Sequence, residues 1–273
     1  MSNSSFCPKV MAILNVTPDS FSDGGKYNSE AAALARASKM VSDGAVIIDV
    51  GGESTRPGAP PVSSAEEIAR VVPVIRAISA SLDVSVSIDT SKAEVMCAAV
   101  AAGACLINDV RAFREPGALD VAADLGVDIC VMHMQGEPRT MQIQPIYESV
   151  VDDVYRFLSD RVEACCMAGI DRERIIIDPG FGFGKSLAHN LALLKKLDRF
   201  KALGLPMLVG VSRKSMIGAI LNKPVADRMI GSVAAATLAA WQGADILRVH
   251  DVAETFDALK VCCAIKSGGI CSQ

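Results

Sequence analysis

The feature that most constrains the fold of this sequence is a unit that recurs eight times along it. In each unit a short apolar run ends at a polar residue, and a loop and a helical pattern follow. Apolar runs without polar alternation are typical of parallel strands that are buried on both faces. The runs and their polar ends are Val10–Leu14 with Asn15, Ala45–Ile48 with Asp49, Val84–Ile88 with Asp89, Ala104–Ile107 with Asn108 and Asp109, Val127–Met132 with His133, Ile175–Ile177 with Asp178, Met207–Val211 with Ser212, and Asp245–Leu247 with Arg248 and then His250.

The helical patterns between these runs end in a common signal, a glycine placed a few residues before the next strand. A glycine at that place predicts a left-handed residue that closes the helix. In the second unit, Ser64 and Glu67 have the spacing of a capping box and predict a helix over Ala65–Ser81. Pro73 lies inside that range, so we expect it to kink or split the helix. The closing glycines are Gly44, Gly103, Gly126, Gly169, Gly204 and Gly243.

Eight strand–helix units in 273 residues predict an α/β fold, a single (β/α)8 TIM barrel, for which about 250 residues are typical. No linker or low-complexity segment divides the chain. We therefore expect one domain over residues 1–273, with short flexible tails at about 1–7 and 267–273. An open doubly wound sheet is the alternative. It is disfavoured because polar residues end all eight runs, and not only those beside one switch point.

Charge and hydropathy exclude several classes of function. The net charge is −4 and there is no basic tract, so nucleic acid is not an expected partner. No apolar run is long enough to span a membrane, and we expect no membrane association. The first residues are polar and contain no apolar signal segment, and the nine cysteines form no C-x-x-C pattern. A cytoplasmic location with reduced thiols is therefore expected.

The carboxyl ends of the strands meet on one face of a barrel, so the polar residues there should surround one pocket. Asp and Asn also serve as helix caps and turn formers, but capping alone does not explain polar ends on all eight strands. Asp49 and Asp109 are the residues that we most readily assign to such structural roles. The residues expected around the pocket are Asn15, Asp89, Asn108, Asp178, Lys214, Arg248 and His250.

One side of this pocket carries groups that suit an anion. Arg56, in a long polar loop after the second strand, would join Arg248 and His250 as donors to a phosphate or diphosphate. Asn15 offers an amide oxygen, a hard ligand that suits Mg²⁺, which commonly binds one or two protein oxygens together with substrate phosphates. Ser212 and Lys214 lie where a helix opens, a position that favours a second anion such as a carboxylate.

The opposite side carries acceptors. Asp89, Asn108 and Asp178 fit no zinc-binding pattern, but carboxylates bind planar N–H pairs such as the edge of a 2-aminopyrimidinone. Phe183 is a candidate apolar wall, as are Met132 and Met134, for which a place in the core is equally compatible with the pattern. The glycine-rich stretch 178–186 lacks both the Walker A spacing and the dinucleotide fingerprint G-x-G-x-x-G.

Several motifs occur in the order and spacing of a known family. They are LNVTPDSFSDGG, DVGGESTRPGA, SIDT, LINDV, MHMQGEPRTMQ, DPGFGFGK, SRKS and RVHDV. In these motifs the chain resembles the bacterial dihydropteroate synthases, and the resemblance covers it from about Val10 to Val261. That resemblance implies condensation of (7,8-dihydropterin-6-yl)methyl diphosphate with p-aminobenzoate to give dihydropteroate and diphosphate, in a pathway to folate. It also implies that sulfonamides compete for the aminobenzoate site and that the protein is a homodimer.

The resemblance also assigns roles to residues. It implies Asn15 as the Mg²⁺ ligand, with Mg²⁺ as the cofactor. It places the diphosphate on Thr55, Arg56, Arg248 and His250. It places the pterin on Asp89, Asn108, Asp178 and Lys214, and the aminobenzoate near Ser212 and Arg56. Phe183 remains a wall of the pocket, and we expect Asp89, Lys214, Arg248 and His250 to act in the chemical step.

Three alternatives remain open on the sequence. A pterin-binding methyltransferase module would use a similar barrel, but its methyl donor has no diphosphate for Arg56, Arg248 and His250 to hold. A catalytically silent paralogue would bind pterin without turnover, although the loop motifs are intact. A purely structural barrel would not need two long polar loops.

Overall fold

The computed structural model describes residues 7–17, 25–54, 61–136, 141 and 145–269. Within them, eight parallel strands form one sheet in the order β6-β5-β4-β3-β2-β1-β8-β7. A parallel bridge between Ile177 and Met207 joins the two ends of that order, so the sheet closes on itself. The predicted (β/α)8 barrel is confirmed, and the open doubly wound sheet is wrong.

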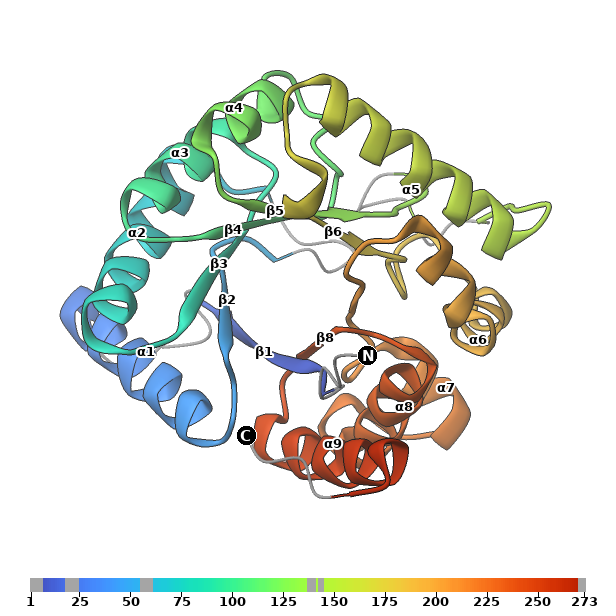
Figure 1. The fold of residues 1–273 in the computed structure, drawn as a ribbon. Helices are drawn as coiled ribbons and strands as arrows, with labels where there is room; N and C mark the ends of the chain where they lie inside the picture. The colour runs from blue at the N-terminus through green and yellow to red at the C-terminus, as the bar shows by residue number, and fades with distance from the viewer. Residues whose placement is uncertain (1–6, 18–24, 55–60, 137–140, 142–144, 270–273) are drawn as a thin grey trace.

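Helices alternate with the strands and surround them (Figure 1). The strands are β1 (Lys9–Asn15), β2 (Ile47–Gly51), β3 (Ser85–Asp89), β4 (Leu106–Asp109), β5 (Asp128–Met132), β6 (Ile175–Asp178), β7 (Leu208–Val209) and β8 (Ile246–Val249). The helices are α1 (Gly25–Ser42), α2 (Ser64–Ser81), α3 (Ala93–Ala101), α4 (Ala118–Leu125), α5 (Val150–Met167), α6 (Leu187–Lys195), α7 (Ser215–Leu221), α8 (Met229–Gln242) and α9 (Val252–Ser267). None of these helices, in the part of the chain that is described, is both long and apolar enough to cross a membrane.

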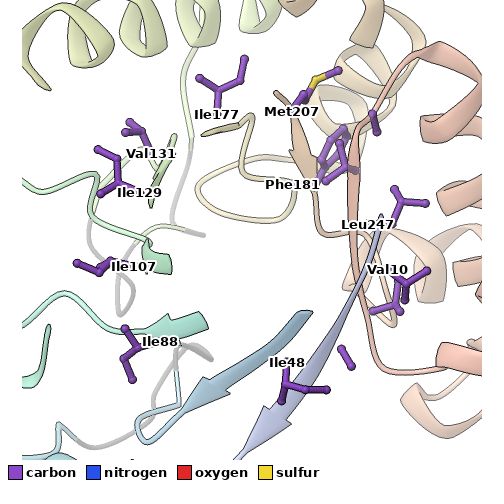
Figure 2. Packing of buried hydrophobic residues seen from close by; sticks show 14 of the residues in the cluster. Val10, Ile48, Ile88, Ile107, Ile129, Val131, Ile177, Phe181, Met207 and Leu247 are labelled. Carbon is purple, nitrogen blue, oxygen red and sulfur yellow. The ribbon is translucent and has the colours of Figure 1, made fainter. Parts of the chain in front are cut away.

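Each strand has two buried faces, as the continuous apolar runs predict. The face toward the helices carries the larger cluster, and Figure 2 shows members of it from strands all around the barrel, including Ile48, Ile88 and Ile107. Burying one such side chain contributes about 1.5–3 kcal/mol. The face toward the barrel axis carries a smaller apolar cluster of Met11, Ile47, Leu106, Cys130, Ile176, Leu208 and Ile246. Nearer the carboxyl ends of the strands, the buried polar residues Asp49 and Ser87 share the interior with apolar ones such as Ile13.

The strand ends differ from the predicted ones in a way that matters for the site, since Asp49, Asn108 and Arg248 lie inside their strands rather than after them. Asp49 was expected to follow the second strand, but it is the third of five residues in β2 and is fully buried. It pairs in register with Ser87 of β3, two residues before the pair formed by Gly51 and Asp89. Asp49 therefore lies inside the barrel rather than at its rim.

The six glycines expected to close helices all have a positive φ, between 68° at Gly126 and 117° at Gly103. The predicted start of α2 is wrong by one residue. Ser63 is the cap, and its hydroxyl accepts from the backbone N–H of Glu66. Glu67 does not reach back to the cap, because its carboxylate is buried and accepts from Lys92 at 2.5 Å.

Helix α2 runs unbroken through Pro73, so the predicted split does not occur. Pro73 removes one backbone donor, but Val71, Val74 and Ile75 on either side of it are buried against the barrel. Most of the stability of a helix in a protein comes from such packing, which explains why α2 continues past Pro73.

We predict that Ser63→Ala lowers the free energy of unfolding by about 1 kcal/mol, because it leaves an N-terminal N–H of α2 without its acceptor. Ser64→Ala is the matched control, since the Ser64 hydroxyl only donates to the exposed Glu94 at 3.3 Å. The urea midpoints of both variants measure the difference. An equal loss in the two would show that Ser63 is not the cap.

Candidate active site

The polar interior of the barrel is organised around the guanidinium of Arg248 on β8. Its Nε donates to Oδ2 of Asp49 at 2.5 Å, and its Nη2 donates to Oδ2 of Asp89 at 2.6 Å. Asn108 on β4 donates to the same Asp49 oxygen at 3.3 Å. Burial opposes the charge of Arg248, but Asp49 and Asp89 raise its pKa above the ordinary value. Three strands thus fix one cation in the centre of the site.

Asp89 ends β3, and its side chain is 11% exposed. Burial raises the pKa of Asp89 to about 7, although Arg248 lowers it, and the nearby Asp49 adds to the rise. A carboxyl with a pKa near neutrality changes its charge easily when a ligand arrives. The protonation state of Asp89 can therefore respond to the charge of an occupant.

Asp178 and Lys214 stand on the side of the glycine-rich loop (residues 179–186). The Gly180 N–H donates to Oδ1 of Asp178 at 2.7 Å, which fixes that carboxylate. Burial raises the pKa of Asp178, and Lys214 opposes the rise. The Lys214 ammonium donates to the carbonyl of Phe181 and lies 4.6 Å from the centre of the Phe183 ring. Burial lowers the pKa of Lys214 to about 8, while Asp178 raises it.

An apolar wall adjoins these two charges. Met132 and Met134, at and just after the end of β5, are 3% and 2% exposed and form a cluster with Val110 and Met141. The half-buried Phe183 packs against that cluster. The three residues expected to supply apolar walls therefore lie together, and they lie beside Lys214. An acceptor, a cation and a flat apolar surface in one place suit a polar heteroaromatic ring.

Ser212 and His250 face each other at the ends of β7 and β8. Nδ1 of His250 lies 3.0 Å from the Ser212 hydroxyl, which also accepts from the His250 N–H at 3.2 Å. Next to them, Arg213 makes an ion pair with Asp251. Arg213 and Asp251 thereby fix the start of the segment that carries Lys214, and the structure gives a reason for the SRKS and RVHDV motifs to occur together.

Asn15 ends β1 and is half-buried. A Cβ at Gly51, the neighbour of Asn15 in register, would lie 3.6 Å from Oδ1 of Asn15 and 3.9 Å from Oδ2 of Asp89. Glycine at this position therefore leaves open the space that the two oxygens face. One neutral oxygen and no surrounding cage is what a cation arriving with phosphate oxygens requires. No cluster of three or more acidic, His or Cys ligands occurs among the described residues.

The loop after β2 is described only up to Ser54, so Thr55 and Arg56 lie outside the described residues. Ion pairs and a hydrogen bond fix the start of this loop at Gly52 and Glu53. Lys92 donates to Glu53 at 2.6 Å and to Glu67 at 2.5 Å, and Arg70 donates to the carbonyl of Gly52 at 2.8 Å.

Two structural assignments made from the sequence have different outcomes. Asp109 accepts from the N–H groups of Arg111 and Phe113 at 2.8 and 2.7 Å, which is the structural role expected of it. Asp49, given a structural role on the same grounds, is instead a direct partner of Arg248. The sequence did contain a signal for this contact. Arg248 lies in a strand expected to be buried, and a buried cation requires a negatively charged partner. The sequence pattern could not choose which carboxylate provides it.

The raised pKa of Asp89 makes a prediction about stability. The folded protein holds this proton up to about pH 7, whereas the ordinary pKa of an aspartate is 3.8. The contribution of Asp89 is thus fully present below pH 3.8 and is lost as the pH rises through 7. The free energy of unfolding of Asp89→Asn minus that of the wild type should increase between these pH values, by at most about 1.4 kcal/mol per pH unit. Urea denaturation at several pH values measures the trend, and a difference that falls or stays level would contradict it.

Known proteins share both the sequence and the fold of this chain. Residues 11–250 match the family model described as pterin binding enzyme. Dihydropteroate synthase of Escherichia coli (strain K12) is 54% identical over 254 residues, which are 93% of this chain and 90% of that protein. The dihydropteroate synthase of Haemophilus influenzae is 56% identical over 254 residues, with 93% and 92% covered.

Solved structures agree with these relatives. The dihydropteroate synthase of Yersinia pestis with a sulfonamide drug complex is similar with a TM-score of 0.92 at 53% identity, covering 98% of this chain and 97% of that one. The Xanthomonas albilineans enzyme in complex with 7,8-dihydropteroate is similar with a TM-score of 0.87 at 50% identity, covering 96% and 94%. The chain therefore belongs to the pterin-binding enzyme family and, within it, to the dihydropteroate synthases, which are transferases.

Proposed function

We propose that this chain condenses (7,8-dihydropterin-6-yl)methyl diphosphate with p-aminobenzoate by breaking the C–O bond before the arylamine attacks. The observation that carries the mechanism is the arrangement of charge. A guanidinium, a lysine and two carboxylates with raised pKa values surround one position at the carboxyl ends of β3, β6 and β8. Such a site is prepared to stabilise two opposite charges that separate during a reaction.

The pterin ring would lie on the side of the glycine-rich loop. Asp178 has one oxygen engaged by Gly180, and its other oxygen would accept from the amino and ring N–H of the pterin, with Asn108 close by. Lys214 would donate to an acceptor on the same ring. Phe183 and the methionine cluster would cover its faces. Asp178, Lys214 and Phe183 already have partners within the protein, which limits the entropic cost of recognition.

The diphosphate would lie toward β7 and β8. Arg248 uses Nε and Nη2 within the barrel, and Nη1 bonds to no described residue, so this nitrogen would donate to the leaving group. His250 would donate from its Nε2 side, because its Nδ1 faces Ser212. Thr55 and Arg56 would complete the anion site from the second loop. The carboxyl group of p-aminobenzoate would lie near Ser212 and the start of α7.

In the chemical step, the bond between the methylene carbon and the diphosphate oxygen breaks and both electrons leave with the diphosphate. The methylene carbon and the ring then share a positive charge, which Asp89 and Asp178 would stabilise as carboxylates. The neutral arylamine attacks that carbon, the C–N bond forms, and the nitrogen loses a proton to water. No strong general base is needed, because an arylamine is already unprotonated at neutral pH.

Mg²⁺ fits the oxygen of Asn15 at the rim, and when bound there together with the diphosphate it would withdraw charge from the leaving group. The role of Asn15 would be to hold the cation on the side of the pocket that Gly51 leaves open. Arg248 and His250 would then stabilise the remaining negative charge of the leaving diphosphate.

The proposal includes a homodimer and a cytoplasmic location. Helix α8 packs against α7 and α9, and these helices expose large apolar side chains, namely Ile220, Leu221, Ile230, Leu238, Trp241, Val261 and Ile265. Exposed apolar groups gathered on neighbouring helices are typical of an interface between subunits, which sedimentation of the full chain tests. The eight cysteines in the described residues are free thiols, and this supports a reducing compartment.

We predict that the purified protein releases diphosphate from the pterin diphosphate when Mg²⁺ and p-aminobenzoate are present, with one dihydropteroate formed per diphosphate. Slow release without the arylamine would support bond breaking before attack, since water then captures the cation. Release that requires the arylamine absolutely would contradict the dissociative order. Binding of the pterin without any release would identify a silent pterin-binding protein.

We also predict that Asn15→Ala raises the Mg²⁺ concentration needed for half-maximal rate about tenfold or more, because the cation loses its protein ligand. Asn15→Asp keeps an oxygen at that place and should need no more Mg²⁺ than the wild type. The KM for p-aminobenzoate is the internal control. If Asn15→Ala and the wild type depend on Mg²⁺ equally, Asn15 does not bind the cation.

A further inference from the structure

Lys185 ends the glycine-rich motif, and the reaction proposed above does not use it. The residue is 3% exposed, which is rare for a lysine because a buried ammonium needs several acceptors to replace water. Its Nζ lies 2.8 Å from the carbonyl oxygen of Gly180, 3.0 Å from that of Phe183 and 2.8 Å from Nδ1 of His133. The backbone carbonyl oxygen of His133 is a fourth acceptor, at 3.4 Å. Four acceptors therefore surround this nitrogen, enough for the three N–H groups of an ammonium.

The contact with His133 crosses from one loop to another. His133 follows β5, whereas the two carbonyls belong to the glycine-rich loop after β6. Burial lowers the pKa of His133 to about 2, and the charge of Lys185 adds to that effect, so the imidazole is neutral. Burial also lowers the pKa of Lys185 well below its ordinary value, and Asp178 opposes that fall. Where Lys185 carries its proton, Nδ1 of His133 accepts from it and the imidazole proton is on Nε2.

The two loops also lie against each other along their backbones. A Cβ at Gly180 would lie 1.9 Å from the His133 carbonyl oxygen, and one at Gly184 would lie 2.3 Å from that of Gln135. Both glycines have positive φ, 69° and 62°. Tyr147 adds a bond of 2.8 Å from its hydroxyl to the carbonyl of Gly184. Close backbone contact thus fixes the position of the glycine-rich loop on the loop after β5, and the Lys185 side chain links the two loops through its contacts with both.

This loop carries groups that face the pterin side of the site. Its first turn supplies the Gly180 N–H that fixes Asp178. Phe181 gives Lys214 its carbonyl acceptor, and Phe183 gives it a ring face. Lys185 bonds the carbonyls of Gly180 and Phe183, the residues on either side of this turn. A shift of the loop would therefore displace an acceptor, a cation and an apolar wall together.

We propose that Lys185 and His133 form a positioning pair that sets the part of the pterin half carried by the glycine-rich loop. The diphosphate half on β7 and β8 has its own contacts, between Ser212 and His250 and between Arg213 and Asp251. Neither residue touches the ring. Lys185 acts by holding the loop that carries Phe183 and that supports Asp178 and Lys214. The inference rests on the proposed function only in naming the ring that this half of the site receives.

The test compares matched variants of the full chain. Lys185→Met keeps the length of the side chain and removes its donors. Lys195→Met, on the exposed surface of α6, is the control for the same replacement. His133→Asn keeps an acceptor oxygen where Nδ1 lies, whereas His133→Leu keeps only an apolar group among Tyr147 and Phe157.

Calorimetry measures the dissociation constant of 6-hydroxymethyl-7,8-dihydropterin, which has no diphosphate. We expect Lys185→Met and His133→Leu to weaken its binding tenfold or more, since small errors of placement are costly in a preorganised site. His133→Asn should stay within about threefold of the wild type, and Lys195→Met should be unchanged. The KM for p-aminobenzoate in Lys185→Met should change less than threefold while the KM for the pterin diphosphate rises.

Two results would overturn the inference. One is wild-type pterin affinity in a folded Lys185→Met. The other is equal loss in His133→Asn and His133→Leu, which would mean that packing and not the hydrogen bond matters. If Lys185→Met does not fold, the two His133 variants decide. A wild type that binds the pterin but releases no diphosphate would overturn the proposed reaction and leave this comparison intact.

Discussion

A single cation held between two carboxylates inside a barrel is the interaction on which this site depends. Arg248 could not be buried alone, because removing a charge from water without a partner costs several kcal/mol. Asp49 and Asp89 provide the partners from two adjacent strands, at 2.5 and 2.6 Å. The cation in turn opposes the burial-driven rise in the pKa of Asp89. The apolar cluster around Met11 fills the barrel toward the amino ends of the strands. Arg248, Asp49 and Asp89 lie next to it on the side of the carboxyl ends, so these three charged residues form the floor of the site.

Above that floor the site has two halves that are held by different means. On one side, hydrogen bonds and close backbone contact between two loops fix Asp178, Phe183 and Lys214. On the other side, Ser212 and His250 hold each other at the ends of β7 and β8. A reaction that separates an anion from a cation benefits from such a division, since each charge needs its own rigid set of dipoles.

Much of this arrangement could be predicted from the sequence because it depends on local pattern. Apolar runs gave the eight strands, glycines gave the helix ends, and polar residues after the strands gave the rim of the pocket. The parts that could not be predicted depend on partners far apart in the chain. Whether Asp49 caps a turn or binds Arg248 depends on the position of β2 relative to β8, which no local pattern contains. The contact between Lys185 and His133 joins two loops, and it could not be predicted from the sequence for the same reason. At the start of α2, Ser63 and Ser64 offer the same hydroxyl, and the buried contact between Glu67 and Lys92 decides between them.

The long separation between Arg248 and its partners also bears on how the protein is made. Asp49 lies 199 residues before Arg248, and Asp89 lies 159 residues before it. A chain that leaves the ribosome with its N-terminus first exposes these carboxylates, and Asp178 as well, long before the guanidinium exists. Until the last strand pairs with β1, the inner face of the unfinished sheet carries negative charges that have to stay in water. Closure of the barrel and neutralisation of its interior charges are therefore one event. In a truncated chain that lacks β8, the interior carboxylates have no cation to pair with, so water cannot be excluded from around them.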